Sequence, residues 1–288
     1  METMAKDTFL NRKTTLNLGG KLVDLRPPAV MGILNLTTDS FYSKSRTATV
    51  EQALERAEII LKEGGQFIDI GAYSSRPGAA DVPAQEEKEK VVAAVEAIAA
   101  AFPEALLSID TFRAEVAKAA IEAGAHLIND ISAGSMDEAM FETVAELGVP
   151  YIIMHMRGTP KTMQQNTSYQ HLMPEMLDYF SDKVSRLKKL GVKDIILDPG
   201  FGFAKTLDQN YLVMQRLQEL DIFELPVLAG LSRKSMIYKF LGEGPEGALN
   251  GTTVLNTMAL LKGANILRVH DVKAAAECIA LVHKTLEQ

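Results

Sequence analysis

Residues 106–131 read LLSIDTFRAEVAKAAIEAGAHLINDI, and this segment carries the signature of the fold. A mostly apolar run at 106–109 precedes a segment, 112–123, in which apolar residues recur three and four positions apart; a second apolar run follows at 126–128. Short apolar runs are typical of buried strands, whereas spacing by three and four indicates an amphipathic helix. Gly124 directly after the helical segment is typical of a helix C-cap. The segment therefore predicts a strand–helix–strand unit with parallel strands.

The same alternation continues along most of the chain. Eight runs resemble strands, at 30–34, 67–70, 106–109, 126–128, 151–154, 194–197, 226–229 and 265–269. Helical spacing occupies 50–62, 85–101, 112–123, 137–147, 174–190, 207–220 and 247–261, and five glycines are expected C-caps: Gly64, Gly124, Gly148, Gly191 and Gly263. Eight such units in 288 residues match an α/β protein of the (β/α)₈ (TIM) barrel class, whose typical size is about 250 residues.

An N-terminal β-hairpin precedes the first predicted barrel strand. Residues 16–25 alternate in polarity around a Gly-Gly pair, which is typical of a tight hairpin turn. No linker rich in Pro, Gly or Ser interrupts the rest. We therefore expect one domain over 1–288, with the hairpin region at 1–29 and the barrel at 30–288.

An open doubly wound sheet is the rival architecture, since it shows the same alternation with fewer strands. Its dinucleotide fingerprint, Gly-x-Gly-x-x-Gly, occurs at Gly242, Gly244 and Gly247. This match follows a helical stretch, 234–241, rather than a strand, and it contains Pro245. A loop between two helices is therefore the better interpretation.

Composition narrows the class of protein further. The formal net charge is −7 and 47% of the residues are hydrophobic, which argues against disorder and against a nucleic-acid partner. Cys278 is the single cysteine, so no intrachain disulfide can form. The first thirty residues lack a signal-peptide pattern, and the most apolar window, 91–102, is too short to span a bilayer. We expect a cytoplasmic protein with no membrane partner.

Polar side chains follow nearly every predicted barrel strand. They are Asn35, Asp69, Asp110, Asn129, Asp130, His155, Asp198, Ser232, Arg233, Lys234, Arg268 and His270. One such residue alone usually caps the next helix. In a parallel barrel, however, the carboxyl ends of all strands meet on one face, where substrates bind. The set therefore predicts a ligand site.

The residue types indicate what the ligand contains. Asp110 and Asp198, with the Asn129 amide, suit a planar heterocycle that carries adjacent N–H donors, because a carboxylate accepts two parallel hydrogen bonds. Lys234 can donate to a ring carbonyl or nitrogen. Arg268, His270 and Asn35, at the ends of the last and first barrel strands, form an expected anion pocket. A ring with a phosphate group is the predicted ligand.

Three further features border this predicted site. Met154, beside His155, is a candidate floor for the ring. Two long polar connections, 37–49 and 72–83, are candidate lids. Arg76 in the second connection could neutralise a leaving group, although most exposed loop arginines are only solvated.

Nine motifs resemble the dihydropteroate synthase family. They read GILNLTTDSF (32–41), DIG (69–71), SSRPGA (74–79), SIDT (108–111), INDI (128–131), HMRGTP (155–160), DPGFGFAK (198–205), SRKS (232–235) and RVHD (268–271). The resemblance implies a cytosolic, Mg²⁺-dependent homodimeric transferase of folate biosynthesis and a target of sulfonamides. It implies condensation of 6-hydroxymethyl-7,8-dihydropterin pyrophosphate with p-aminobenzoate, giving 7,8-dihydropteroate and pyrophosphate. It also implies that pyrophosphate leaves first, in an SN1-like step. We place the dimer interface on the late helices as a separate hypothesis.

The resemblance also assigns roles to residues. Those that match the family's pterin positions are Asp110, Asn129, Asp198 and Lys234. Asn35, Arg268 and His270 match its pyrophosphate and metal positions, with Asn35 as the metal ligand. Those that match its p-aminobenzoate positions are Ser75, Arg76, Pro77, Phe203 and Ser235. The implied catalytic group consists of Asp110, Lys234, Arg268, His270 and Arg76.

Both candidate lids depart from the family pattern. Thr38 stands where Pro is common, residues 72–75 read AYSS in place of GEST, and 43–46 read SKSR after the first motif. Two alternatives therefore stay open: a pterin-dependent methyl transferase acting on a corrinoid protein, and a pterin-binding homologue without activity. The first has no use for an anion pocket of Arg268 and His270, and the second is expected to lack several loop motifs.

Overall fold

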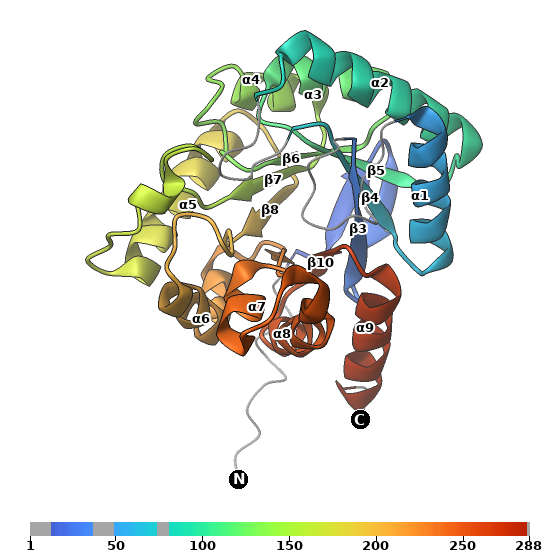
Figure 1. Cartoon of the computed structure of the whole chain (residues 1–288). Coiled ribbons are helices and arrows are strands. Elements are labelled where there is room, and N and C mark those ends of the chain that lie inside the picture. Colours follow the sequence, from blue (N-terminus) through green and yellow to red (C-terminus); the bar gives the residue numbers. More distant parts are fainter. Residues whose placement is uncertain (1–12, 37–48, 74–80, 287–288) are drawn as a thin grey trace.

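Eight parallel strands form a ring at the centre of the molecule (Figure 1). The structure, a computed structural model, describes residues 13–36, 49–73 and 81–286. The ring consists of β3 (Ala29–Asn35), β4 (Phe67–Gly71), β5 (Leu106–Asp110), β6 (Leu127–Asp130), β7 (Tyr151–Met154), β8 (Ile195–Asp198), β9 (Leu228–Ala229) and β10 (Ile266–Val269). The hydrogen-bonded order is β8-β7-β6-β5-β4-β3-β10-β9, and one bridge between Leu197 and Val227 connects β8 to the segment before β9. The (β/α)₈ prediction is confirmed.

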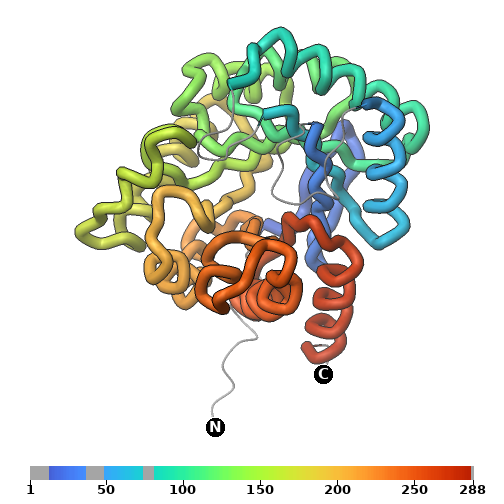
Figure 2. Tube along the Cα trace, in the orientation of Figure 1, coloured from blue at the N-terminus to red at the C-terminus, as the bar shows by residue number. Residues whose placement is uncertain are grey.

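Helices surround this ring in chain order. The last strand, β10, pairs with the first, β3, and the trace in Figure 2 shows the two ends of the barrel meeting in this way. The helices are α1 (Val50–Lys62), α2 (Ala84–Ala101), α3 (Ala114–Glu122), α4 (Met140–Leu147), α5 (Leu172–Lys189), α6 (Leu207–Gln215), α7 (Ser235–Leu241), α8 (Leu249–Leu261) and α9 (Val272–Leu286), with 3₁₀ turns η2 (Met163–Gln165), η3 (Leu217–Phe223) and η4 (Pro245–Ala248). The five predicted capping glycines all have positive φ. The Gly-x-Gly-x-x-Gly segment joins α7 to η4, as expected of a loop between helices. No helix in the described part of the chain is long and apolar enough to cross a membrane.

One helix prediction was wrong at its C-terminal end. The segment 207–220 was expected to be a single helix, but α6 stops at Gln215 and η3 follows it. A 3₁₀ helix has three residues per turn, so side chains three apart share one face. Leu217 and Leu220 are such a pair, and both are buried. An α-helix would also place residues three apart close together on one face, so the predicted apolar spacing holds and only the winding of this segment differs.

The predicted hairpin closes the amino-terminal end of the barrel. β1 (Thr15–Leu18) pairs antiparallel with β2 (Lys21–Asp24), and Gly19 and Gly20 form the turn with φ of 61° and 91°. Both angles lie in the left-handed region that a tight hairpin turn requires and that glycine adopts at little cost. Leu16 and Leu18 are buried against the inward-facing residues at the start of the barrel strands.

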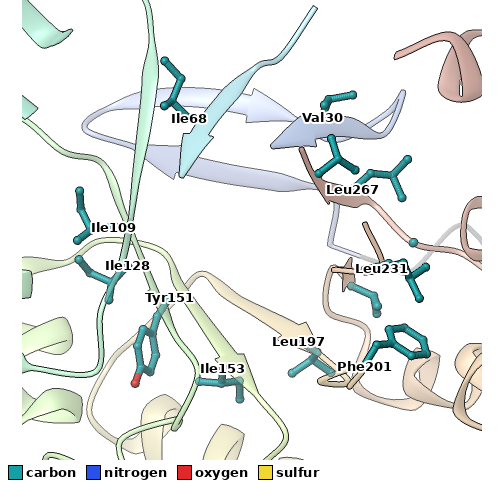
Figure 3. Close-up of a cluster of buried hydrophobic side chains, with 14 of the residues drawn as sticks. Val30, Ile68, Ile109, Ile128, Tyr151, Ile153, Leu197, Phe201, Leu231 and Leu267 are labelled. Atoms are coloured by element: carbon teal, nitrogen blue, oxygen red, sulfur yellow. The ribbon is translucent and has the colours of Figure 1, made fainter. Parts of the chain in front are cut away.

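The barrel strands divide their side chains between two cores. Side chains of successive strand residues point to opposite faces of a sheet. One set faces the helices, and Figure 3 shows members of it along neighbouring strands, including Ile68, Ile109 and Ile153. The other set, which includes Phe67 and Ile152, fills the interior next to the hairpin. The interior is therefore apolar at its amino-terminal end, and the same face of each strand continues toward the site.

Candidate active site

Alternation along the strands places polar groups directly above the inner apolar core. In β4 the inward residue after Phe67 is Asp69, and in β6 the inward residue after Leu127 is Asn129. β10 repeats the pattern with Ile266 and then Arg268. Since all these strands are parallel, their polar residues reach the same height in the barrel. The predicted convergence at the carboxyl ends is confirmed for these strands.

Asp69 is the centre of a hydrogen-bond network in this layer. It is fully buried, and its Oδ1 accepts from the Ser108 hydroxyl at 2.6 Å. Its Oδ2 accepts from Asn129 Nδ2 at 3.0 Å and from Arg268 Nε at 2.5 Å. Arg268 Nη2 donates to Asp110 Oδ2 at 2.6 Å. The guanidinium is therefore held between two carboxylates.

Asp110 is the carboxylate of this pair that reaches the open end of the barrel. Its side chain is 22% exposed, against 0% for Asp69. Loss of solvent raises the pKa of Asp110 to about 7, Arg268 acts against this rise, and Asp69 adds to it. The charge of Asp110 therefore changes near neutral pH. Burial lowers the pKa of Arg268, but Asp69 and Asp110 more than offset this effect and hold it above its ordinary value.

A second acid–base pair, Asp198 and Lys234, lies at the same end of the barrel, and the Arg268 charge acts on the pKa of both groups. A Cβ built on Gly230 would lie 3.8 Å from Lys234 Nζ and 3.9 Å from Asp198 Oδ2, so both groups face one small space. Burial lowers the pKa of Lys234 to about 8, and the Asp198 carboxylate acts against this shift. Burial also raises the pKa of Asp198, with Lys234 as the largest opposing influence. The two groups therefore favour each other's charged form.

An apolar wall stands beside these charges. Met154 is buried and pairs in register with Asp198 of the next strand. It belongs to a cluster with Phe112, Ile131, Met156, Met163 and Ala204, and Tyr73, Met136 and Phe203 pack against that cluster. Lys234 Nζ lies 4.8 Å from the centre of the Phe203 ring. The position of Met154 next to the carboxylates fits the predicted floor, and its contact with a ring stays a prediction.

The residues predicted to bind the anion lie on the adjoining part of the rim. Asn35 ends β3 half-buried, and β3 pairs with β10, which carries Arg268. His270 is buried, and its backbone N–H donates to Ser232 Oγ at 3.1 Å. Ser235 is the half-buried first residue of α7. Arg268 was expected to serve this anion pocket, but its Nε and Nη2 are engaged by carboxylates, so its role toward pyrophosphate stays a prediction.

Part of the predicted site lies outside the described residues. This holds for Ser75, Arg76 and Pro77, for most of the two candidate lids, and for the departures at 38, 43–46 and 74–75. Their assignment to p-aminobenzoate and to the leaving group therefore stays a prediction. Tyr73 is described at the edge of the second lid, where its ring packs edge-on to Phe112 at 4.9 Å.

The structure shows contacts of three residues for which no specific role was predicted, Ser108, Arg233 and Lys205. Ser108 supports Asp69, and its inward position follows from its spacing of two from Asp110. Arg233 lies in the predicted rim set and is buried, with Nε and Nη2 on the two oxygens of Asp271 at 2.8 and 2.9 Å. This ion pair joins the loop after β9 to the loop after β10. Lys205 is also buried, in an irregular loop where no periodicity could have indicated its position.

Known proteins resemble this chain over most of its length. A family profile described as pterin binding enzyme matches residues 31–270. The chain is 43% identical to the dihydropteroate synthase of Escherichia coli over 93% of this chain and 95% of that protein. It is 40% identical to that of Haemophilus influenzae, over 94% and 98%.

Solved structures show the same likeness in three dimensions. The Yersinia pestis dihydropteroate synthase in complex with a sulfonamide drug superposes with a TM-score of 0.91 at 42% identity, over 95% of this chain and all of that one. The Xanthomonas albilineans dihydropteroate synthase with 4-aminobenzoic acid gives 0.88 at 35% identity, over 96% and 99%. The chain belongs to the pterin-binding enzyme family, among the dihydropteroate synthases.

Proposed function

We propose that this protein condenses 6-hydroxymethyl-7,8-dihydropterin pyrophosphate with p-aminobenzoate to form 7,8-dihydropteroate and pyrophosphate. The observation that carries the proposal is the facing of Asp110 with Asn129 and of Asp198 with Lys234 around one opening beside an apolar wall. Relatives solved with 4-aminobenzoic acid and with a sulfonamide drug support the choice of substrate. An anionic pterin ester and an aromatic amine both suit such a mixed site.

Binding of the pterin follows from the donors and acceptors of the ring. Asp198 is oriented by the Gly200 N–H, which donates to its Oδ1 at 2.7 Å, so Oδ2 faces the opening. An ionised carboxylate accepts from two adjacent N–H groups, and the Lys234 ammonium donates to a ring carbonyl or nitrogen. Met154 provides the apolar surface against which the ring lies.

The reaction breaks one C–O bond and forms one C–N bond. Pyrophosphate leaves with the electron pair of the C–O bond, and the aniline nitrogen then attacks the exocyclic carbon and loses a proton. Asp110 in its ionised form stabilises the positive charge that spreads over the pterin between these steps. His270 and Arg268 neutralise charge that develops on the pyrophosphate. Water would otherwise capture the cation, and its exclusion is the role predicted for the candidate lids, most of which lie outside the described residues.

We propose that Mg²⁺ binds with a single protein ligand together with oxygens of the substrate. No group of three or more His, Cys, Asp or Glu side chains in the described part of the chain could hold a metal. Mg²⁺ commonly keeps several waters and is held by few protein oxygens together with substrate phosphates. The half-buried Asn35 amide oxygen at the rim is the protein ligand that we propose. When bound, the ion would neutralise charge on the pyrophosphate.

We further propose a cytoplasmic homodimer that sulfonamides inhibit in competition with p-aminobenzoate. Large apolar side chains on α7 and α8 support the dimer, because they are exposed on adjoining helices (Figure 1). Cys278 is a free, buried thiol, which accords with a reducing compartment.

The test is product formation by the purified protein with the pterin pyrophosphate and Mg²⁺, with and without p-aminobenzoate. Pyrophosphate release is measured together with chromatography for dihydropteroate. We expect dihydropteroate only when p-aminobenzoate is present. Pterin binding without condensed product would contradict the proposal and favour the methyl-transferase or inactive-homologue alternatives.

A further inference from the structure

We propose that Lys205 is a positioning residue that shapes the p-aminobenzoate side of the site by fixing the loop of residues 199–204. This inference rests on the function proposed above. Lys205 is 3% exposed and does not reach the opening itself. Its ammonium contacts the backbone of the loop that carries Phe203.

The ammonium of Lys205 has three hydrogens and three acceptors at equal distance. Nζ lies 3.0 Å from Gly200 O, 3.0 Å from Phe203 O and 3.0 Å from His155 Nδ1; His155 O is farther, at 3.4 Å. An ammonium can only donate, so Nδ1 of His155 accepts and its ring proton lies on Nε2. Burial and the Lys205 charge hold the pKa of His155 well below its ordinary value, which keeps the ring neutral as this contact requires.

The loop depends on such side-chain contacts because its backbone is irregular. Gly200, Gly202 and Ala204 have φ of 68°, 82° and 48°, and alternating left-handed residues prevent a regular ladder. Gly200 also lies against β7, since a Cβ there would be 2.2 Å from His155 O. Lys205 connects the two ends of this loop, Gly200 and Phe203, to His155. The loop is thereby fixed against the strand that carries Met154.

Lys205 affects substrate binding through Phe203, which matches a p-aminobenzoate position of the family. Its ring packs against the apolar wall and lies under Lys234 Nζ, and Lys234 also donates to Phe201 O in the same loop. Release of the Phe203 carbonyl would let the ring leave this position. Asp198 would be affected less, because it belongs to β8 and Lys234 is the largest of the charges that favour its ionised form, whereas Lys205 is the smallest. Loss of Lys205 should therefore weaken the binding of p-aminobenzoate more than that of the pterin.

Filling space alone does not explain a lysine at this position. Burial lowers the pKa of Lys205 to about 7, with Asp198 acting against the shift, so the interior disfavours its charged form. An apolar side chain of similar length would avoid the cost of burying a cation. A cation is useful here because it can donate to three acceptors at once, two on the 199–204 loop and one on His155.

Lys205→Met, measured in the full-length enzyme at one pH, tests the inference. We expect KM for p-aminobenzoate to rise on the order of 10-fold or more, because small displacements of positioning groups have effects of this size. KM for the pterin pyrophosphate and its binding in the absence of p-aminobenzoate should stay within about 2-fold. Lys183→Met is the matched control, since Lys183 is also buried but contacts Ser135 on another loop. It should leave both KM values unchanged.

Two outcomes would overturn the inference. In one, Lys205→Met melts at a lower temperature with both KM values unchanged, which would make Lys205 only a stabilising group. In the other, the KM values for both substrates rise by the same factor. If Lys205→Met does not fold, His155→Leu removes one of the three acceptors and should raise the same KM by a smaller factor, and no rise would reject the idea. Failure of the proposed function is distinct, because the unaltered enzyme would then form no dihydropteroate.

Discussion

Two neighbours act in opposite directions on the charge of Asp110. Arg268, at 2.6 Å, favours the carboxylate, and the buried Asp69 on the other side of that guanidinium disfavours it. The fully buried Asp69 also orients Asn129 and Arg268, so it fixes the geometry while it weakens the acidity of Asp110. A residue that never meets solvent thus adds to the rise in the pKa of Asp110, of which burial is the largest cause.

The pH dependence of kcat/KM for the pterin pyrophosphate should be bell-shaped. Asp110 acts as a carboxylate, so activity is lost as the pH falls through its pKa of about 7. Lys234 acts as an ammonium, so activity is lost as the pH rises through its pKa of about 8. Initial rates across both limbs, in buffers of constant ionic strength, measure this profile. Asp69→Asn should move only the acid limb to lower pH, and an unmoved acid limb would contradict this account of Asp110.

Lys234→Ala and Asp110→Ala should each abolish turnover without unfolding the protein. Asp110 ends β5 and Lys234 is the N-cap of α7, and neither belongs to the packed apolar clusters, so their removal leaves those layers intact. We expect losses of about 100-fold or more, as for other groups that stabilise transition-state charge. Steady-state rates with thermal unfolding by circular dichroism measure both effects. Lys239→Ala on α7 is the control, and full activity in either site variant would remove that residue from the site.

At the scale of elements, sequence periodicity carries most of the information about this fold. All eight barrel strands lie within two residues of their predicted positions, because each needs a short apolar run to bury both faces. The helix expected at 207–220 ends at Gln215 and η3 follows it, and the spacing of the buried Leu217 and Leu220 suits both kinds of helix, so the apolar pattern does not distinguish them. Local patterns thus indicate which elements exist, but not how the last turn of each is wound.

The N-terminal hairpin should stabilise the barrel without influencing the site. Leu16 is fully buried in the inner core, at the end opposite the opening. Leu16→Ala should lower the free energy of unfolding by about 2–5 kcal/mol, as for other buried leucines. Leu22→Ala on the same hairpin, 74% exposed, should change it by no more than about 0.5 kcal/mol. Urea unfolding measures both; equal effects would show that the hairpin is not part of the core.

At the scale of the whole molecule, the site depends on closure of the ring. Parallel topology alone predicts that Asp110, Asn129 and Asp198 meet, since each ends a strand of one sheet. The contact of Arg268 with Asp69, 199 residues earlier, forms only because β10 pairs with β3. No local pattern contains that pairing, so the sequence did not predict the ion pairs of Arg268 with Asp69 and Asp110. The contacts of Lys205 were missed for a different reason, since its loop is irregular and no periodicity indicates where that side chain lies.

Closure of the barrel also leaves an apolar surface on its outside, from which we expect a two-fold symmetric dimer. On α8, Val254, Met258 and Leu261 are 51%, 40% and 58% exposed, and their spacing of four and three places them on one face. Phe240 of the adjoining α7 is 65% exposed. Exposed apolar side chains gathered on one face mark interaction surfaces, and two copies of one face can bury each other in a closed dimer.

Sedimentation velocity should therefore give about twice the chain mass of 31.4 kDa for the unaltered protein. Val254→Glu should shift it toward the monomer, because pairing the two faces would bury an unpaired carboxylate from each copy. The control is Leu22→Glu, which places the same charge on an exposed leucine of the hairpin, away from α8, and should leave the dimer intact. A monomer at every concentration of the unaltered protein would reject the dimer, and a Val254→Glu dimer would place its interface on another face. Because the opening lies inside each ring, the dissociated variant should keep its KM for both substrates.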